Sequence, residues 1–195
     1  MQHINVLLFD DYTSLDAFGP LEVFSRLKQH YEIEYFSLYG GAVKSSVNSQ
    51  ILTRKLSEIK SHDILLVPGG FATRELINDE KFLSELRNLA DMSKVVLSVC
   101  TGSVLLARAG VLKNKRATSN KSSWEFVTSA SKEVEWMKLA RWVKDGKFYT
   151  SSGVAAGIDM ALGFVSEIHG LQTARDIAKL MEYIWNEDMN FDPFA

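Results

Sequence analysis

Cys100 is the one cysteine of the chain, and its place in the sequence is the first feature that could do chemistry. The apolar run at 95–99 predicts a buried strand directly before it, and helical periodicity resumes after it at Val104 and Leu105. A residue between a buried strand and the first turn of a helix lies at a sharp elbow, where free backbone N–H groups point towards its side chain. Because these groups stabilise negative charge, the sequence predicts a thiolate with a pKa below the ordinary value of about 8.5.

The alternative for Cys100 is a small buried side chain with no chemical role, which is a common state of a free cysteine. Gly102 favours the elbow, because a glycine leaves room where the helix packs back onto the strand. A single thiol cannot form an internal disulfide, and the N-terminus lacks the pattern of a secretory signal. We therefore expect a reactive cysteine in a cytoplasmic protein.

Three separated segments, in this order along the chain, resemble the ThiJ/PfpI superfamily, which is class I glutamine amidotransferase-like. They are VPGG (67–70), VVLSVCTGSVLLARAGVLKNKRAT (95–118) and SSGVAAGIDMALG (151–163). The resemblance runs from about Asn5 to Glu182. The Cys-Thr-Gly-Ser elbow, Asp16 in LDAFGPLEVF (15–24) and the AGIDMAL segment are most similar to the isocyanide hydratase branch. The resemblance implies a flavodoxin-like fold and a homodimer.

The resemblance also assigns roles to Asp16 and Thr101. An Asp at this place reaches the cysteine in the hydratases, although a carboxylate that favours the start of a helix explains Asp16 equally well. Thr101 is expected to hydrogen-bond Asp16 or the substrate, while its backbone N–H joins that of Gly70 in an anion hole; its hydroxyl could instead cap the helix. Gly69 and Gly70 let the main chain approach a ligand, but Pro-Gly-Gly is also an ordinary turn. We expect Asp16→Asn to change the free energy of unfolding by under about 1 kcal/mol, as a substitution on the surface does.

Related proteases and amidotransferases carry a histidine after the elbow, and this chain has Asn120 there. The proteases also have a histidine directly after the cysteine, where this chain has Thr101. The role of Asn120 is left open, and Ser152 and Gly153 are expected to line the same pocket. The substrate-binding residues predicted in this way are Gly69, Gly70, Asn120, Ser152 and Gly153. The histidines expected to be solvated surface residues are His3, His30, His62 and His169.

Strand and helix patterns alternate along the chain, and they predict the frame that positions these residues. Buried strands are expected at 4–9, 33–38, 63–67 and 94–99. One hairpin is expected from 42–46 and 50–55, and a second from 140–144 and 147–150. Helices are expected from Ser14 and at 80–92, 101–109, 122–130, 155–169 and 171–186. The predicted fold is α/β: a flavodoxin-like three-layer sandwich, with a mostly parallel sheet, helices on both faces and a peripheral hairpin. Residues 1–195 are expected to form a single domain. Ligands of such folds bind beyond the carboxyl ends of the strands.

Composition narrows the range of partners. Lys and Arg total 22 against 24 for Asp and Glu, so no basic excess favours nucleic acid or an anionic membrane. No apolar run approaches the roughly 20 residues that span a bilayer. No nucleotide-binding motif and no cluster of His and Cys with metal-ligand spacing is present, so we expect neither cofactor nor metal.

The expected function, as the resemblance implies, is addition of water to an isocyanide to give an N-formamide. Cys100 would form a thioimidate with a small electrophilic substrate, and Asp16 would act as general acid and base, which requires no histidine. A non-catalytic oxidative-stress sensor or small-ligand-binding protein with the same cysteine is the main alternative. A glyoxalase or deglycase, or an intracellular protease or amidase, would also fit the superfamily. The missing histidine weighs against both, and Asp16 in place of Glu weighs against the deglycase.

Overall fold

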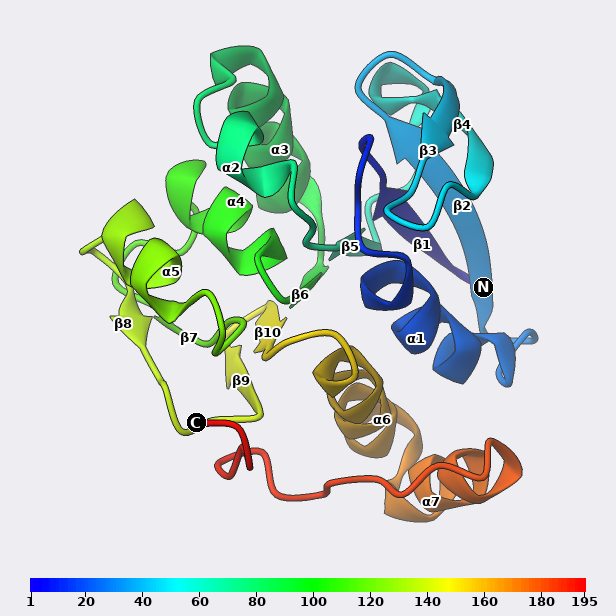
Figure 1. The fold of residues 1–195 in the computed structure, drawn as a ribbon. Helices are drawn as coiled ribbons and strands as arrows, with labels where there is room; N and C mark the ends of the chain where they lie inside the picture. The colour runs from blue at the N-terminus through cyan, green and yellow to red at the C-terminus, as the bar shows by residue number, and fades with distance from the viewer.

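The eight strands of the main sheet lie in the order β3-β4-β2-β1-β5-β6-β10-β9 in the computed structural model, which describes residues 1–195 (Figure 1). In chain order they are β1 (Gln2–Leu7), β2 (Tyr31–Ser37), β3 (Gly41–Lys44), β4 (Gln50–Lys55), β5 (Ile64–Val67), β6 (Val95–Val99), β9 (Trp142–Asp145) and β10 (Phe148–Ser151). The six inner strands pair in parallel, and the edge strands β3 and β9 are antiparallel to their neighbours. The predicted mostly parallel sheet with a peripheral hairpin is confirmed.

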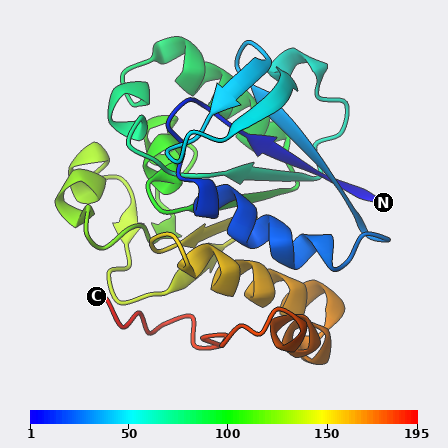
Figure 2. The ribbon, with the colours of Figure 1, turned by 45° about the vertical axis from the view of Figure 1, so that its right-hand side comes forward.

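Helices cover both faces of this sheet, as the three-layer prediction requires. They are α1 (Ser14–Ser25), α2 (Thr73–Leu76), α3 (Glu80–Met92), α4 (Gly102–Arg108), α5 (Trp124–Ala130), α6 (Ala156–His169) and α7 (Leu171–Leu180), with a 3₁₀ turn at Leu56–Glu58. Helices α1 and α6 pack side by side on one face, α3 and α4 cover the other, and α7 packs on α6 (Figure 2). No helix combines the length and the hydropathy needed to cross a membrane.

The central strands are apolar along their whole length because both of their faces are covered. All four residues of β5 and the last four residues of β6 are buried. A cluster of 46 buried apolar residues extends through both helical layers. The carboxyl ends of β1, β5 and β6 are therefore fixed relative to one another, and the loops that follow them lead into α1, α2 and α4.

The last helix is shorter than its sequence pattern predicts. Helix α7 ends at Leu180, although apolar residues continue to 185. Tyr183 and Trp185 do pack against the core, but they do so from an irregular segment, in which they hydrogen-bond Asp159 over 3.0 and 3.2 Å. From there the chain runs back along α6 towards β9, as Figure 1 shows.

Small elements account for the other differences from the prediction. Helix α2 has four residues, and β7 (Arg116–Ala117) and β8 (Glu135–Trp136) form a separate two-stranded sheet of two residues each. Segments this short carry no periodic signal, so the sequence does not reveal them.

Candidate active site

The elbow predicted at Cys100 is present. The residue follows β6 directly, and α4 begins two positions later at Gly102. The backbone of Cys100 is left-handed, with φ of 55°, which costs a residue with a side chain of the order of 1 kcal/mol or more. A Cβ on Gly102 would lie 2.3 Å from the carbonyl oxygen of Val67. Glycine is therefore required where α4 crosses the end of β5.

Hydrogen bonds from three segments fix Cys100 in this conformation. Its carbonyl oxygen accepts from the hydroxyls of Ser103 and Ser119, at 3.0 and 2.8 Å. Its N–H donates to the carbonyl oxygen of Ser152 at 3.1 Å. The Nδ2 of Asn120 donates to the sulfur at 3.2 Å. The thiol, which is 6% exposed, is thus held at a defined place beside the sheet.

Asp16 lies in the first turn of α1, and no solvent reaches it. Its Oδ2 accepts a hydrogen bond of 2.9 Å from the N–H of Gly69, while its Oδ1 has no partner. A Cβ on Gly69 would lie 2.6 Å from both the N and the Oγ1 of Thr101 and 2.9 Å from Asp16 Oδ2, so the absence of a side chain lets these groups meet. Burial raises the pKa of Asp16 to about 7, although hydrogen bonds from Gly69 and the Cys100 thiol act in the opposite direction.

The prediction of a lowered thiol pKa is wrong. Burial, and then the charge of Asp16, raise the pKa of Cys100 to about 12. The N–H groups of Thr101 and Val154 and the amide of Asn120 stabilise the thiolate, but they do not outweigh the loss of solvent. The thiol and the carboxyl interact directly and titrate as a pair that holds a single proton above about pH 7.

The side chain of Thr101 is hydrogen-bonded neither to Asp16 nor to the first turn of α4 as a cap. Its Oγ1 accepts from the N–H of Gly70 at 3.1 Å, and the hydroxyl of Thr73 lies 3.1 Å from it. The backbone N–H of Thr101 favours negative charge on the Cys100 sulfur. Of the two N–H groups expected to form an anion hole, that of Gly70 is occupied by the Thr101 hydroxyl. Thr73 is a member of the site that the sequence did not reveal.

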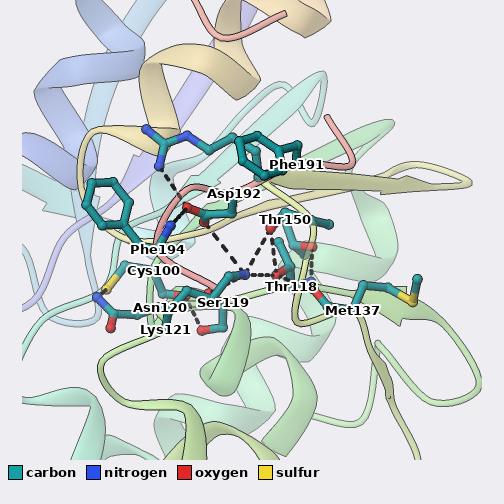
Figure 3. Close-up of polar contacts among 12 residues, drawn as sticks. Cys100, Thr118, Ser119, Asn120, Lys121, Met137, Thr150, Phe191, Asp192 and Phe194 are labelled. Atoms are coloured by element: carbon teal, nitrogen blue, oxygen red, sulfur yellow. Dashed lines mark hydrogen bonds and ion pairs between the residues drawn. The ribbon is translucent and has the colours of Figure 1, made fainter. Parts of the chain in front are cut away.

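Asn120, Ser152 and Gly153 come together on the other side of the thiol. A Cβ on Gly153 would lie 2.6 Å from Asn120 Nδ2, so glycine makes room for the amide beside the sulfur. These three residues line a cavity of about 240 Å³. Its other lining residues are Lys121, Ser122, Arg141, Val154 and Phe194. Gly69 and Gly70 do not line the cavity, because they pack against Asp16 and Thr101. Figure 3 shows Asn120 beside Cys100.

No histidine is hydrogen-bonded to Cys100 or to the buried carboxyl beside it. His3 Nδ1 lies 3.1 Å from a carboxylate oxygen of Glu34, and His169 Nε2 lies 2.6 Å from the hydroxyl of Tyr31. Of the four histidines, His30 is exposed and His3, His62 and His169 are partly exposed. No three side chains of His, Cys, Asp or Glu gather closely enough to hold a metal ion.

A buried thiol at a strand-to-helix elbow, with a buried carboxyl beside it at the edge of a flavodoxin-like sheet, defines a class of α/β proteins built around one cysteine. The chain belongs to the DJ-1/PfpI family, whose model matches residues 2–167.

Among curated proteins, the chain is 33% identical to an isonitrile hydratase of Pseudomonas putida over 92% of its own length and 78% of the relative. It is 28% identical to the transcriptional regulator CdhR of Pseudomonas aeruginosa over 85% of the chain, but it spans only 49% of that regulator. Among solved structures, a ThiJ/PfpI family protein of Pseudomonas syringae is 28% identical, with a TM-score of 0.82 over 98% of this chain and 78% of that one. The family thus includes both an enzyme and regulators.

Proposed function

We propose that the protein is an isocyanide hydratase-like lyase, in which Cys100 is the nucleophile and Asp16 the general acid and base. The observation that carries the proposal is the buried Cys100–Asp16 pair with no histidine bonded to either member. Hydration of an isocyanide needs one nucleophile and one group that can give and take a proton. The similarity to isonitrile hydratase supports the same activity.

The reaction begins when the single proton of the pair resides on Asp16, which leaves Cys100 as a thiolate. The sulfur attacks the terminal carbon of the isocyanide, and the Asp16 carboxylic acid protonates that carbon to give a thioimidate. The Asp16 carboxylate then takes a proton from water as the oxygen adds to the same carbon, and it passes that proton to the nitrogen. The new hydroxyl next gives its proton to Asp16 while the carbon–oxygen double bond forms and the carbon–sulfur bond breaks. This step restores the Cys100 thiolate and the Asp16 acid and releases the N-formamide, so that water and isocyanide are the only reactants consumed.

Backbone and amide donors support the thiolate during this sequence. The N–H groups of Thr101 and Val154 and the Nδ2 of Asn120 all favour negative charge on the sulfur. Asn120 has no proton to exchange at neutral pH, so proton transfer is left to Asp16. This division of roles gives Asn120 a function at the place where related proteases carry a histidine. Thr101 contributes through its backbone, and its hydroxyl orients the N–H of Gly70.

The test is formamide production from a simple alkyl isocyanide, followed by NMR. The native protein is expected to form the formamide, whereas Cys100→Ala is expected to form none beyond the uncatalysed rate. Equal formation by the native protein and Cys100→Ala would overturn the proposal. Casein and chromogenic amides serve as negative substrates, and cleavage that Cys100→Ser abolishes would favour the protease reading instead.

A second candidate, a small-ligand-binding domain, is favoured by the similarity to CdhR. In that case Cys100 would have no catalytic role, and its Ala variant would bind the ligand as the native protein does. A thiol that is 6% exposed, with a raised pKa, is a poor substrate for oxidants, which counts against the sensor alternative. We also propose a cytoplasmic homodimer with one domain over residues 1–195, and light scattering tests the dimer.

A further inference from the structure

Asp192 anchors the C-terminal segment beside the candidate active site, although it is an acidic residue in an irregular segment. It is 3% exposed, and its N–H donates to the carbonyl oxygen of Leu139 at 2.7 Å. Its Oδ1 lies 3.5 Å from Arg141 Nη1, and its Oδ2 lies 3.8 Å from Lys121 Nζ. Figure 3 shows the Asp192 carboxylate facing the ammonium group of Lys121.

The two cations are themselves fixed by the core of the protein. Lys121 Nζ, on a side chain that is 5% exposed, donates to Thr118 Oγ1 at 2.6 Å and to the carbonyl oxygen of Ala140 at 2.9 Å. Arg141 Nε donates to Asp159 Oδ2 at 2.7 Å. Removing one member of a buried ion pair leaves an uncompensated charge, so loss of the Asp192 carboxylate is expected to release the segment.

Phe194 follows the anchor by two residues and completes the cavity next to Asn120. Its N–H donates to Asp192 Oδ1 at 3.0 Å, which fixes the backbone that carries the ring. Of the eight residues that line the cavity, only Phe194 and Val154 are apolar. The Phe194 side chain is 74% exposed, so it has apolar surface left to cover a ligand.

We propose that Phe194 determines the specificity of the enzyme, as the outer wall of the cavity that receives the substituent of the isocyanide, and that Asp192 is its positioning residue. The inference rests on the proposed function, because it assigns the substituent to this cavity. Cys100 does not itself line the cavity, but Asn120 and Val154 do, and both carry donors that favour negative charge on the Cys100 sulfur, so the cavity adjoins the thiol. Its volume of about 240 Å³ is below the usual range of drug-sized sites, so the substrate class is isocyanides with small alkyl groups.

The first test compares a small and a bulky substrate, n-propyl and cyclohexyl isocyanide. Phe194→Ala is expected to raise the ratio of kcat/KM for the bulky over the small substrate by about tenfold or more. Phe191→Ala is the matched control, because Phe191 is exposed in the same segment but does not line the cavity. Asp192→Asn is expected to shift the ratio in the same direction as Phe194→Ala. An unchanged ratio in Phe194→Ala would overturn the inference.

A second measurement separates this inference from the proposed function. Cys100 is alkylated at pH 9 with iodoacetamide and with a bulky N-aryl maleimide, and intact mass gives both rates. Phe194→Ala is expected to accelerate the bulky reagent at least fivefold relative to the small one, and Phe191→Ala is expected to change neither. If no isocyanide is turned over but this ratio rises, the route past Phe194 stands and the hydratase proposal fails. If the ratio does not rise while melting temperatures stay equal, the wall assigned to Phe194 is wrong.

Discussion

The amide of Asn120 donates to the sulfur of Cys100 over 3.2 Å, and its orientation is set from its other end. Its Oδ1 accepts from the hydroxyl of Ser122 at 2.6 Å and from the N–H of Ser123 at 3.1 Å. With two donors on the oxygen, the nitrogen must face the thiol. The side chain therefore acts as a fixed donor towards negative charge on the sulfur, and it cannot lose this role by deprotonation or by turning its oxygen to the sulfur.

Asn120→Ala should slow the reaction because it removes this donor from the thiolate. A hydrogen bond to a charged group contributes about 1.5–3 kcal/mol, so kcat/KM should fall roughly 10- to 100-fold. Steady-state kinetics with an alkyl isocyanide measure the change. Ser122→Ala removes only one orienting contact and should lower the rate less. Full activity in Asn120→Ala would show that the amide does not stabilise the thiolate.

Asp16→Asn should separate the reactivity of the thiol from turnover. Turnover should fall by about 10²–10⁴, because the amide cannot deliver a proton to the substrate carbon. Alkylation of Cys100 by iodoacetamide at pH 8 should become faster, because the charge that raises the pKa of the thiol is gone. Both rates are measured on the same preparation.

Glu22→Gln provides the control for Asp16→Asn, because Glu22 is exposed on the same helix and pairs with Arg26. Neither rate should change in it. A variant Asp16→Asn that alkylates faster but still turns over normally would remove Asp16 from the mechanism and leave Cys100 as a nucleophile that works without it.

The activity should rise as the pH increases through about 7. Below that pH both Cys100 and Asp16 are protonated, and above it the pair holds the single proton that the mechanism uses. The profile of kcat/KM between pH 5.5 and 9 measures the step, which Asp16→Asn should lack. A fall in activity across pH 7 would mean that the doubly protonated pair is the active form.

Asp16 should also make stability depend on pH. Its pKa rises from 3.8 to about 7 on folding, so the folded protein binds the proton more tightly than the unfolded chain does. Its contribution to stability is complete below pH 3.8 and is lost as the pH rises through about 7, by up to about 4 kcal/mol. The free energy of unfolding of Asp16→Asn relative to the native protein should therefore increase from pH 4.5 to pH 8. Urea denaturation at both pH values measures it, and a constant difference would contradict it.

The same burial corrects the sequence-based view of Asp16. An acidic side chain at the start of a helix is ordinarily solvated. The sequence therefore predicts that Asp16→Asn changes the free energy of unfolding by under about 1 kcal/mol, as a surface substitution does. The structure buries it completely beneath Gly69 and Thr101. Its environment is built by the loops after β5 and β6, which are remote in sequence, so local pattern alone could not reveal it.

Elements with a strong local signal were predicted closely. Helix α3 has the expected bounds, Glu80–Met92, because its apolar face is regular and Asp79 caps it by accepting from the N–H of Phe82 at 3.0 Å. The elbow at Cys100 was also predicted, since a buried strand and a helix meet there. The direction of the thiol pKa was not, because it depends on how deeply the elbow is covered and on a charge from another strand end.

The ion pairs of Asp192, on the other side of the site, could not be predicted from the sequence either. Nothing in the sequence near Asp192 indicates that its partners are Lys121 and Arg141, or that the segment returns to the sheet edge. Such contacts follow from the path of the whole chain, and the composition of a short polar segment does not determine that path.

The left-handed backbone of Cys100 has a consequence for any attempt to improve this protein by selection. Glycine adopts that conformation without steric cost, so Cys100→Gly should fold more stably than Cys100→Ala. Among variants that lack the sulfur, a laboratory evolution experiment that rewarded heat resistance alone would therefore favour glycine over alanine at this position. The native cysteine carries a backbone cost that glycine avoids, and a demand for chemistry gives a reason to retain it.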